Sequence, residues 1–214
     1  MIDRIKNESD IEFALVKLSE QDPALIPVIN SVDHVPLRLS KDGVEGLVKI
    51  VTSQLISRAA ANAIWLRIEN GMSEVNEENI LRYSEDDLMG LGLSRAKAKT
   101  FRTIALASSD GMINFSELNL KPADKALKEL MSLKGIGRWS AEVYLMFCCG
   151  HCDFFPAGDI ALRSAAGDIF HDGNRPDEKS LRLLADRWSP YKSVAARLLW
   201  SYYANTKNRE ILPL

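Results

Sequence analysis

A short turn with two glycines carries residues that could bind an anion. The turn is Leu133-Lys134-Gly135-Ile136-Gly137, and it lies between two segments with helical periodicity, residues 123–131 and 138–149. Glycine permits backbone conformations and close approaches that a side chain would block, and the N-terminus of the second helix directs N–H groups and a positive dipole end outward. Such a turn can hold a nucleic-acid phosphate. The alternative is a plain helical hairpin whose glycines only end the first helix.

A single carboxylate follows at the start of the next predicted helix. Asp159 ends the run Pro156-Ala157-Gly158-Asp159 and precedes the helical segment 160–165. A fixed carboxylate can stabilise the positive charge that develops on a sugar carbon when a glycosidic bond breaks, and it can orient the attacking water. Aspartate is also a favoured helix N-cap, so capping alone would explain the residue. Both roles can coexist, because a cap fixes the position of the carboxylate.

Four separated motifs resemble the helix-hairpin-helix DNA glycosylase superfamily, and within it the alkylated-base, AlkA-like branch. They are GIGRWSA at 135–141, PAGDIALR at 156–163, TSQLIS at 52–57 and the late segment 185–200, in the order of the family. The resemblance spans residues 43–203. It implies an all-α, two-lobed helix-hairpin-helix DNA glycosylase fold with a DNA groove between the lobes, in a compact form without an N-terminal β-rich domain.

Length and composition favour one domain. A chain of 214 residues with 46% hydrophobic residues can bury one core, and no linker rich in glycine, serine or proline divides it. We expect one lobe over about 43–155, which includes the hairpin at 133–137, and a second lobe formed by 1–42 and 156–214. Neither a signal peptide nor a stretch of ~20 apolar residues is present. We therefore expect an intracellular protein, in the cytoplasm and nucleoid, or in the nucleus of a eukaryote.

Charge is nearly balanced over the whole chain but is unevenly distributed. The net charge of −2 argues against a nucleic-acid binder that relies on a strong basic excess. Residues 69–87 are acidic, whereas residues 175–209 are basic. A local basic face near the hairpin would comprise Arg95, Lys97, Lys99, Lys134 and Arg138. The alternative is that these side chains belong to ordinary solvated helix faces.

The resemblance assigns roles to the site residues. Asp159 would be the catalytic carboxylate. Trp139 stands where bifunctional members of the superfamily have the lysine that forms a Schiff base, so we expect the abasic product to stay uncut. Trp139 and Trp200 would stack on an electron-poor alkylated purine, and Tyr144, beside Val143, would be a further pocket residue. The alternative for both tryptophans is a place in the core.

The resemblance also implies how DNA would be held. Leu55 would be the wedge that fills the gap left by an extruded base, with Gln54 as its polar neighbour before Ser57. The alternative places Leu55 in the core, on a helix predicted over 44–56. The hairpin residues that would contact DNA are Gly135, Ile136, Gly137, Arg138 and Ser140. A structural Na⁺ or K⁺ would bind the backbone carbonyls of Met131, Leu133 and Ile136.

Three cysteines and a histidine lie close together in the sequence. Cys148 and Cys149 are adjacent and would point in different directions on a helix, and Cys152 follows His151. A zinc site needs four well-spread ligands and a four-iron cluster normally needs four thiolates. We therefore expect reduced thiols that fill a core, no required cofactor and no iron–sulfur cluster.

Capping residues and periodicity predict helices through nearly the whole chain. Ser9-Asp10-Ile11-Glu12 has the spacing of a capping box and predicts a helix to about residue 20. Further helices are expected over 44–56 and 58–69, after Ser84, and from Ser94 to residue 107. Pro176 and Pro190 should each start a C-terminal helix.

The resemblance to the helix-hairpin-helix DNA glycosylases implies a monofunctional DNA glycosylase. It would act as a monomer on double-stranded DNA and hydrolyse the N-glycosidic bond of alkylated purines such as 3-methyladenine. The second hypothesis is a non-catalytic protein of the same fold that binds damaged or abasic DNA. A helix-turn-helix transcription factor is disfavoured, because the helix after the hairpin presents Val143, Leu145 and Phe147 instead of base-reading side chains.

Overall fold

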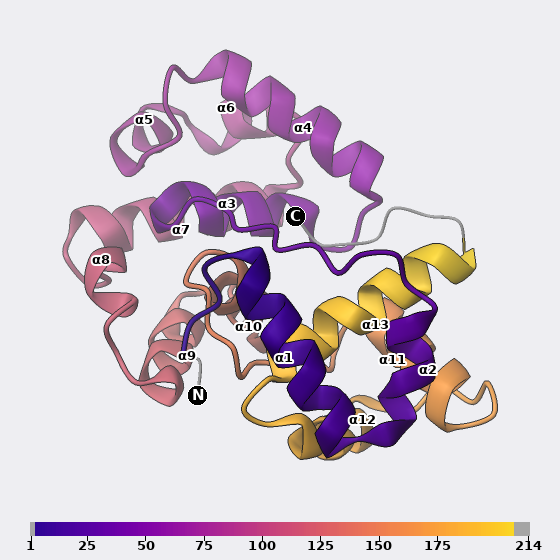
Figure 1. Ribbon diagram of the computed structural model, residues 1–214. Coiled ribbons are helices and arrows are strands. Elements are labelled where there is room, and N and C mark those ends of the chain that lie inside the picture. Colours follow the sequence, from indigo (N-terminus) through magenta and orange to yellow (C-terminus); the bar gives the residue numbers. More distant parts are fainter. Residues whose placement is uncertain (1–2, 208–214) are drawn as a thin grey trace. The chain divides into compact units, whose positions relative to one another are not determined.

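The computed structural model describes residues 3–207 and is helical within them (Figure 1). The only pairing of strand type in this part of the chain is an isolated bridge between Arg4 and His151, so the predicted all-α fold is confirmed. The described chain divides into two compact units, one formed by residues 3–39 and 150–207, the other by residues 40–149. The single-domain arrangement expected from the sequence stays a prediction.

The unit of residues 40–149 is built around one long helix. Its helices are α3 (Gly43–Ser53), α4 (Arg58–Gly71), α5 (Glu77–Arg82), α6 (Glu85–Gly90), α7 (Arg95–Ser109), α8 (Phe115–Leu118), α9 (Ala123–Ser132) and α10 (Arg138–Phe147). Helices α3, α5 and α6 pack on α7, whose Phe101 and Ile104 are fully buried (Figure 1). Helices α9 and α10 form the hairpin and contact each other.

Side-chain caps explain where most of these helices begin. Ser57, Ser84 and Ser94 each accept a hydrogen bond from the backbone N–H three residues ahead, at the starts of α4, α6 and α7. The caps predicted at Ser84 and Ser94 are therefore confirmed. Helix α3 ends at Ser53, three residues short of the helix predicted to continue to residue 56.

The other unit contains the first and last helices of the chain. They are α1 (Glu8–Gln21), η1 (Pro23–Leu25), α2 (Ile26–Asn30), α11 (Ile160–Phe170), α12 (Glu178–Ala185), η2 (Asp186–Trp188) and α13 (Lys192–Lys207). Helix α13 packs on α1, α2 and α11 and is buried over residues 193–201. The fully buried guanidinium of Arg197 donates to the carbonyls of Leu37 and Ser193 at 3.2 and 3.3 Å, and burial lowers its pKa to about 10.

Three predicted helix starts were wrong by two residues. Asn7 caps α1 instead of Ser9: its Oδ1 accepts from the N–H of Asp10 at 3.0 Å, and Asp10 Oδ2 accepts from the N–H of Asn7 at 3.2 Å. Asn7 and Asp10 have the same three-residue spacing as the expected box of Ser9 and Glu12, so the local sequence fits a capping box at either of two positions. Helix α12 begins at Glu178 and α13 at Lys192, each two residues beyond the proline that was expected to start it, Pro176 and Pro190.

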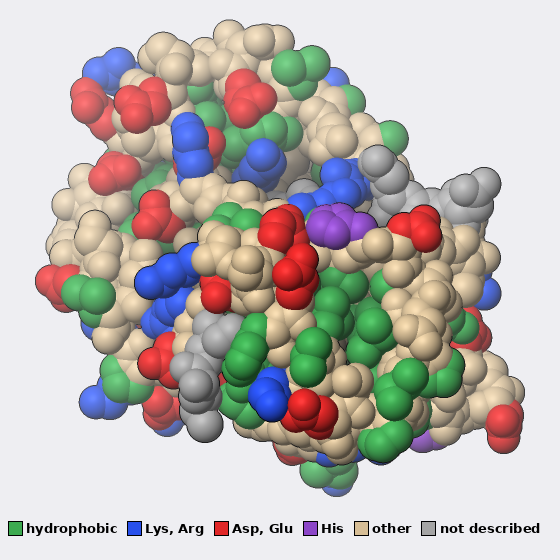
Figure 2. All heavy atoms as spheres, viewed as in Figure 1, with side chains coloured by type: hydrophobic (Ala, Val, Ile, Leu, Met, Phe, Trp, Pro, Cys, Tyr) green, Lys and Arg blue, Asp and Glu red, His purple; other side chains and the backbone are tan. Residues whose placement is uncertain are grey.

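The surface carries separate acidic and apolar regions. Figure 2 shows acidic side chains over α5 and α6, which belong to the acidic segment 69–87 of the sequence. Hydrophobic side chains gather over α1 and α2, where Phe13, Val16 and Ile26 are exposed (Figure 2). Over residues 3–207, none of the helices has the length and apolar character that crossing a bilayer requires.

Candidate functional site

The first glycine of the hairpin is required by the backbone and by packing. Gly135 has φ +95°, in the left-handed region that side chains disfavour. A Cβ atom at this position would collide with the side chain of Thr100 on α7, with Cγ2 at 2.8 Å and Cβ at 2.9 Å. The turn therefore lies directly against α7, and this contact fixes where α10 begins.

The second glycine leaves the start of α10 open. Gly137 is the N-cap of α10, with φ −85° and no side-chain cap on the helix. A Cβ built on Gly137 would meet nothing within 4 Å. The N–H groups of the first turn of a helix have no partner within that helix, and Gly137 has no side chain that could cap them. The geometry is that of an anion site built from backbone, with the positive end of the helix dipole behind it.

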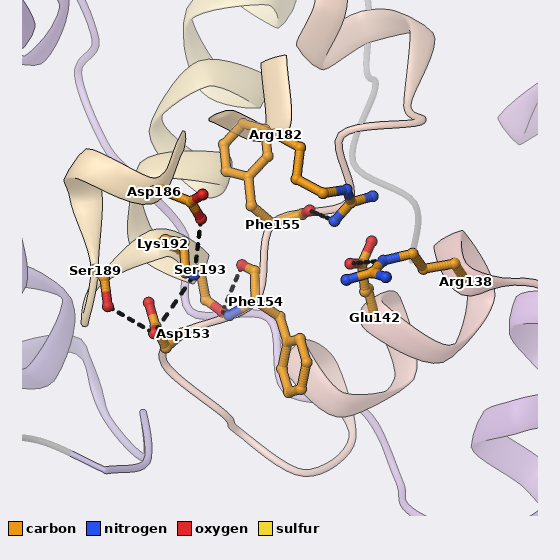
Figure 3. Close-up of polar contacts among 10 residues, drawn as sticks. All are labelled: Arg138, Glu142, Asp153, Phe154, Phe155, Arg182, Asp186, Ser189, Lys192 and Ser193. Carbon is orange, nitrogen blue, oxygen red and sulfur yellow. Dashed lines mark hydrogen bonds and ion pairs between the residues drawn. The ribbon is translucent and has the colours of Figure 1, made fainter. Parts of the chain in front are cut away.

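The first turn of α10 also holds a charged pair. Arg138 Nε lies 2.9 Å from Oε1 of Glu142, one helical turn later (Figure 3). Glu142 is buried, whereas Arg138 is about half exposed. The buried carboxylate offsets the charge of Arg138, so this arginine offers less net positive charge than the sequence suggested. Trp139, which follows it, is half-buried.

The loop between α3 and α4 presents a leucine to solvent. Leu55 is fully exposed and has φ +58°, a left-handed conformation that costs a non-glycine residue about 1–2 kcal/mol. Exposure of an apolar side chain in a disfavoured backbone conformation indicates a functional constraint. The alternative that Leu55 belongs to the core was wrong, because α3 ends before it.

Other predicted residues surround this loop. The Gln54 side-chain amide donates to Oγ of Ser140 at 2.7 Å, so the loop and α10 are directly connected within one unit. Ser57 caps α4. Lys97, expected on a basic face, instead directs its ammonium group to the backbone carbonyls of Thr52 and Gln54 at 2.8 and 2.7 Å. No sequence signal linked Lys97 to this loop.

Tyr144 lies in the core of its unit. It is fully buried, its ring lies 5.8 Å from that of Phe115, and its hydroxyl accepts a hydrogen bond from the N–H of Gly43 at 2.8 Å. Burial raises the pKa of its hydroxyl above the ordinary value. These contacts explain Tyr144 as a residue that anchors the start of α3, and its role in a base pocket stays a prediction.

Asp159 is fixed by three hydrogen bonds to one oxygen. It is the N-cap of α11, as the sequence predicted, and Oδ1 accepts from the N–H groups of Ala161 and Leu162 at 2.9 and 3.1 Å. The indole Nε1 of Trp200 on α13 donates to the same oxygen at 3.1 Å. Trp200 is fully buried. Two helices thus orient this carboxylate, and the core placement considered for Trp200 is compatible with a role beside Asp159.

The segment before Asp159 is held by α13. Ser193 is fully buried, and its hydroxyl accepts from the N–H of Phe154 and donates to the Phe154 carbonyl, both at 3.0 Å (Figure 3). The Ser193 N–H donates to the Cys152 carbonyl at 2.8 Å. Asp153 accepts from Ser189 Oγ at 2.8 Å (Figure 3). Sequence reasoning missed Ser193, because its partners lie about forty positions away.

The three cysteines are thiols and not disulfides, and they are divided between the two units. Cys148 and Cys149 belong to residues 40–149, whereas His151 and Cys152 belong to the other unit. Burial raises the pKa of the Cys148 thiol and raises that of Cys152 to about 11. Burial, with the nearby Arg4, lowers the pKa of His151 to about 4. Within residues 3–207, no group of three or more His, Cys, Asp or Glu side chains is arranged to hold a metal ion.

Comparisons with known proteins agree with these features. Residues 48–190 match the model of the HhH-GPD superfamily of base excision DNA repair proteins. The alkylbase DNA glycosidase-like protein mag2 of Schizosaccharomyces pombe is 29% identical over 161 residues, which cover 73% of this chain and 76% of that protein.

Two solved structures have the same fold over nearly the whole chain. The DNA-3-methyladenine glycosidase of Bacillus halodurans is 30% identical, with a TM-score of 0.78 and 91% of each chain covered. The S. pombe 3-methyladenine DNA glycosylase Mag1, solved with abasic DNA, is 25% identical, with a TM-score of 0.81 and coverage of 93% of this chain and 98% of that one. The chain therefore belongs to the HhH-GPD superfamily of base excision DNA repair proteins, in the AlkA-like DNA glycosylase branch.

Proposed function

We propose that this protein is a monofunctional DNA glycosylase that hydrolyses the N-glycosidic bond of alkylated purines of the 3-methyladenine type. The observation that carries the proposal is the fixed carboxylate of Asp159, whose Oδ1 accepts two backbone N–H groups and the Trp200 indole. The names of the relatives, 3-methyladenine DNA glycosylases among them, support the substrate class.

In this proposal the carboxylate acts on the sugar. Departure of the base leaves a deoxyribose with oxocarbenium character, and a negative charge near the anomeric carbon stabilises it. Alkylation makes the purine electron-poor and therefore a better leaving group. Because three donors fix Oδ1, the carboxylate needs no reorientation when charge develops, and it can orient the water that completes hydrolysis.

The proposal that the protein lacks lyase activity rests on Trp139. An indole carries no amine that could form a Schiff base with the sugar, so the reaction would end at an intact abasic site. Half-buried on the first turn of α10, Trp139 would instead stack on the electron-poor base.

DNA would be held by the hairpin and by the exposed leucine. The open start of α10, at Gly137, would take a phosphate through backbone N–H groups, with Gly135, Ile136, Arg138 and Ser140 around it. Leu55 would enter the base stack where the damaged base has left, with Gln54 and Ser57 at its sides. The carbonyls of Met131 and Leu133 at the end of α9 and of Ile136 in the turn are hard oxygen donors that would hold a Na⁺ or K⁺ ion, whose charge adds to phosphate binding.

The test is release of free base from duplex DNA treated with a methylating agent. We expect 3-methyladenine in the supernatant and strand breaks only after alkali, because the abasic product stays intact. Breaks before alkali would show lyase activity and contradict the assignment of Trp139. If a folded protein releases no base and yet binds an abasic duplex tightly, the non-catalytic binder replaces the proposal.

Trp200→Phe should lower the rate of base release about tenfold, because the donor to Asp159 is lost while most of the ring is kept. The measurement is the single-turnover rate at saturating enzyme. Trp65→Phe is the matched control: Trp65 is also buried, and its indole N–H has no hydrogen-bond partner among the described residues. Equal rates for the two variants would contradict a positioning role for the Trp200 N–H.

A further inference from the structure

The exposed leucine lies in a loop that needs support. Leu55 has φ +58° and no contact that buries its side chain, so its own packing does not stabilise the conformation. The loop follows directly from the last turn of α3, and its preceding residue, Gln54, is extended with φ −56° and ψ 127°. Something other than the leucine must therefore keep the side chain projecting.

Lys97 makes two contacts with the chain directly before Leu55. Its ammonium group donates to the carbonyl of Thr52, in the last turn of α3, at 2.8 Å and to the carbonyl of Gln54, directly before Leu55, at 2.7 Å. Hydrogen bonds from a charged donor are among the stronger ones. The two carbonyls belong to residues on either side of Ser53, so one cation fixes the direction in which the chain leaves the helix.

The surroundings of Lys97 favour this contact over one with a ligand. Its neighbours on α7, Ala98 and Thr100, are buried, so the helix backbone that carries the lysine is anchored in the core. The ammonium also lies at the C-terminal end of α3, where the helix dipole is negative. Partial burial lowers the pKa of Lys97, in agreement with a group withdrawn from solvent.

We propose that Lys97 is a positioning residue that holds Leu55 in its projecting conformation before DNA is bound. The inference rests on the proposed function, in which Leu55 is the wedge. The Gln54 amide, bound to Ser140 on α10, holds the same loop from the hairpin side. The wedge is then preorganised, and binding does not have to order it.

The test compares binding of two duplexes, one with a tetrahydrofuran abasic-site analogue and one intact, by fluorescence anisotropy. We expect Lys97→Met to lower the preference for the abasic duplex about tenfold. The double variant Lys97→Met/Leu55→Ala should lose no more than Leu55→Ala alone, because both changes act through the same wedge. Lys125→Met, at an exposed lysine on α9 in the same unit, is the matched control and should keep the preference.

Three results would overturn the inference. An unchanged preference in Lys97→Met would do so, and so would additive losses in the double variant. The third result is an equal loss of affinity for both duplexes in Lys97→Met, together with a salt dependence of binding that falls by about one phosphate contact. Lys97 would then be a phosphate ligand instead. If Leu55→Ala itself leaves the preference unchanged, the wedge and with it this part of the proposed function fail, which is a different result from failure of Lys97 alone.

A second variant separates positioning from folding. Lys97→Gln keeps a hydrogen-bond donor on a shorter stem and should show a preference between those of the wild type and Lys97→Met, provided that thermal unfolding monitored by circular dichroism is unchanged. A preference equal to that of the wild type would contradict the need for an ammonium group at this position.

Discussion

Asp159→Asn should reduce the rate of base release by at least about a hundredfold and leave the fold unchanged. Asparagine is as good an N-cap as aspartate, and its side-chain oxygen can still accept from the N–H groups of Ala161 and Leu162 and from Trp200. The variant therefore removes the negative charge and little else. The measurement is the single-turnover rate on methylated duplex, with thermal unfolding recorded in parallel.

Asp177→Asn is the matched control for this prediction. Asp177 caps α12 by accepting from the N–H of Ser180 at 2.7 Å, and it is exposed. It therefore undergoes the same chemical change in the same structural role. We expect the wild-type rate from Asp177→Asn. Wild-type activity in Asp159→Asn would rule out the carboxylate as the group that stabilises the sugar.

Gly135→Ala should be the most destabilising single change at the hairpin, with a loss of about 2–5 kcal/mol in the free energy of unfolding. The left-handed φ of +95° strains any side chain, and the added Cβ would collide with Thr100 on α7. Urea unfolding gives the loss directly. DNA binding should also fall, because α10 can no longer begin where it does.

Gly137→Ala provides the contrast at the same turn. Its φ of −85° suits alanine, and the added methyl group meets no atom within 4 Å, so stability should fall by less than about 1 kcal/mol. Affinity for abasic duplex should nevertheless fall, because the methyl group occupies the space that a phosphate would take. Unchanged affinity in a stable Gly137→Ala would contradict phosphate binding at the start of α10.

Helix caps and the hairpin, which depend on neighbouring residues, could be predicted from the sequence. The caps at Ser84, Ser94 and Asp159 follow from a polar residue directly before an apolar period, and the hairpin follows from two glycines between amphipathic segments. Where two local patterns overlapped, as with Asn7 and Ser9, the sequence did not distinguish the registers. Leu55 was ambiguous for a similar reason, since its apolar character fits both a helix face and a wedge.

Contacts between residues far apart in the sequence could not be predicted from it. Trp200 lies 41 positions from Asp159, and Lys97 lies 43 positions from Gln54. Neither pair leaves a local pattern, because only the packing of α13 on α11 and of α7 on α3 brings them together. The sequence alone marked Lys97 as one of several surface cations, and only the structure showed that its charge is used inside the protein.

The open start of α10 has a consequence for how such a protein would search a genome. Backbone N–H groups and a helix dipole attract a phosphate only at contact, whereas free lysines and arginines attract DNA over a Debye length. Here the Arg138 charge is offset by Glu142, the Lys97 charge is turned inward, and the net charge is −2. Among the cations expected near the hairpin, these two would therefore add little to the attraction of undamaged DNA, and binding would depend more on contact at the start of α10 and on entry of the leucine.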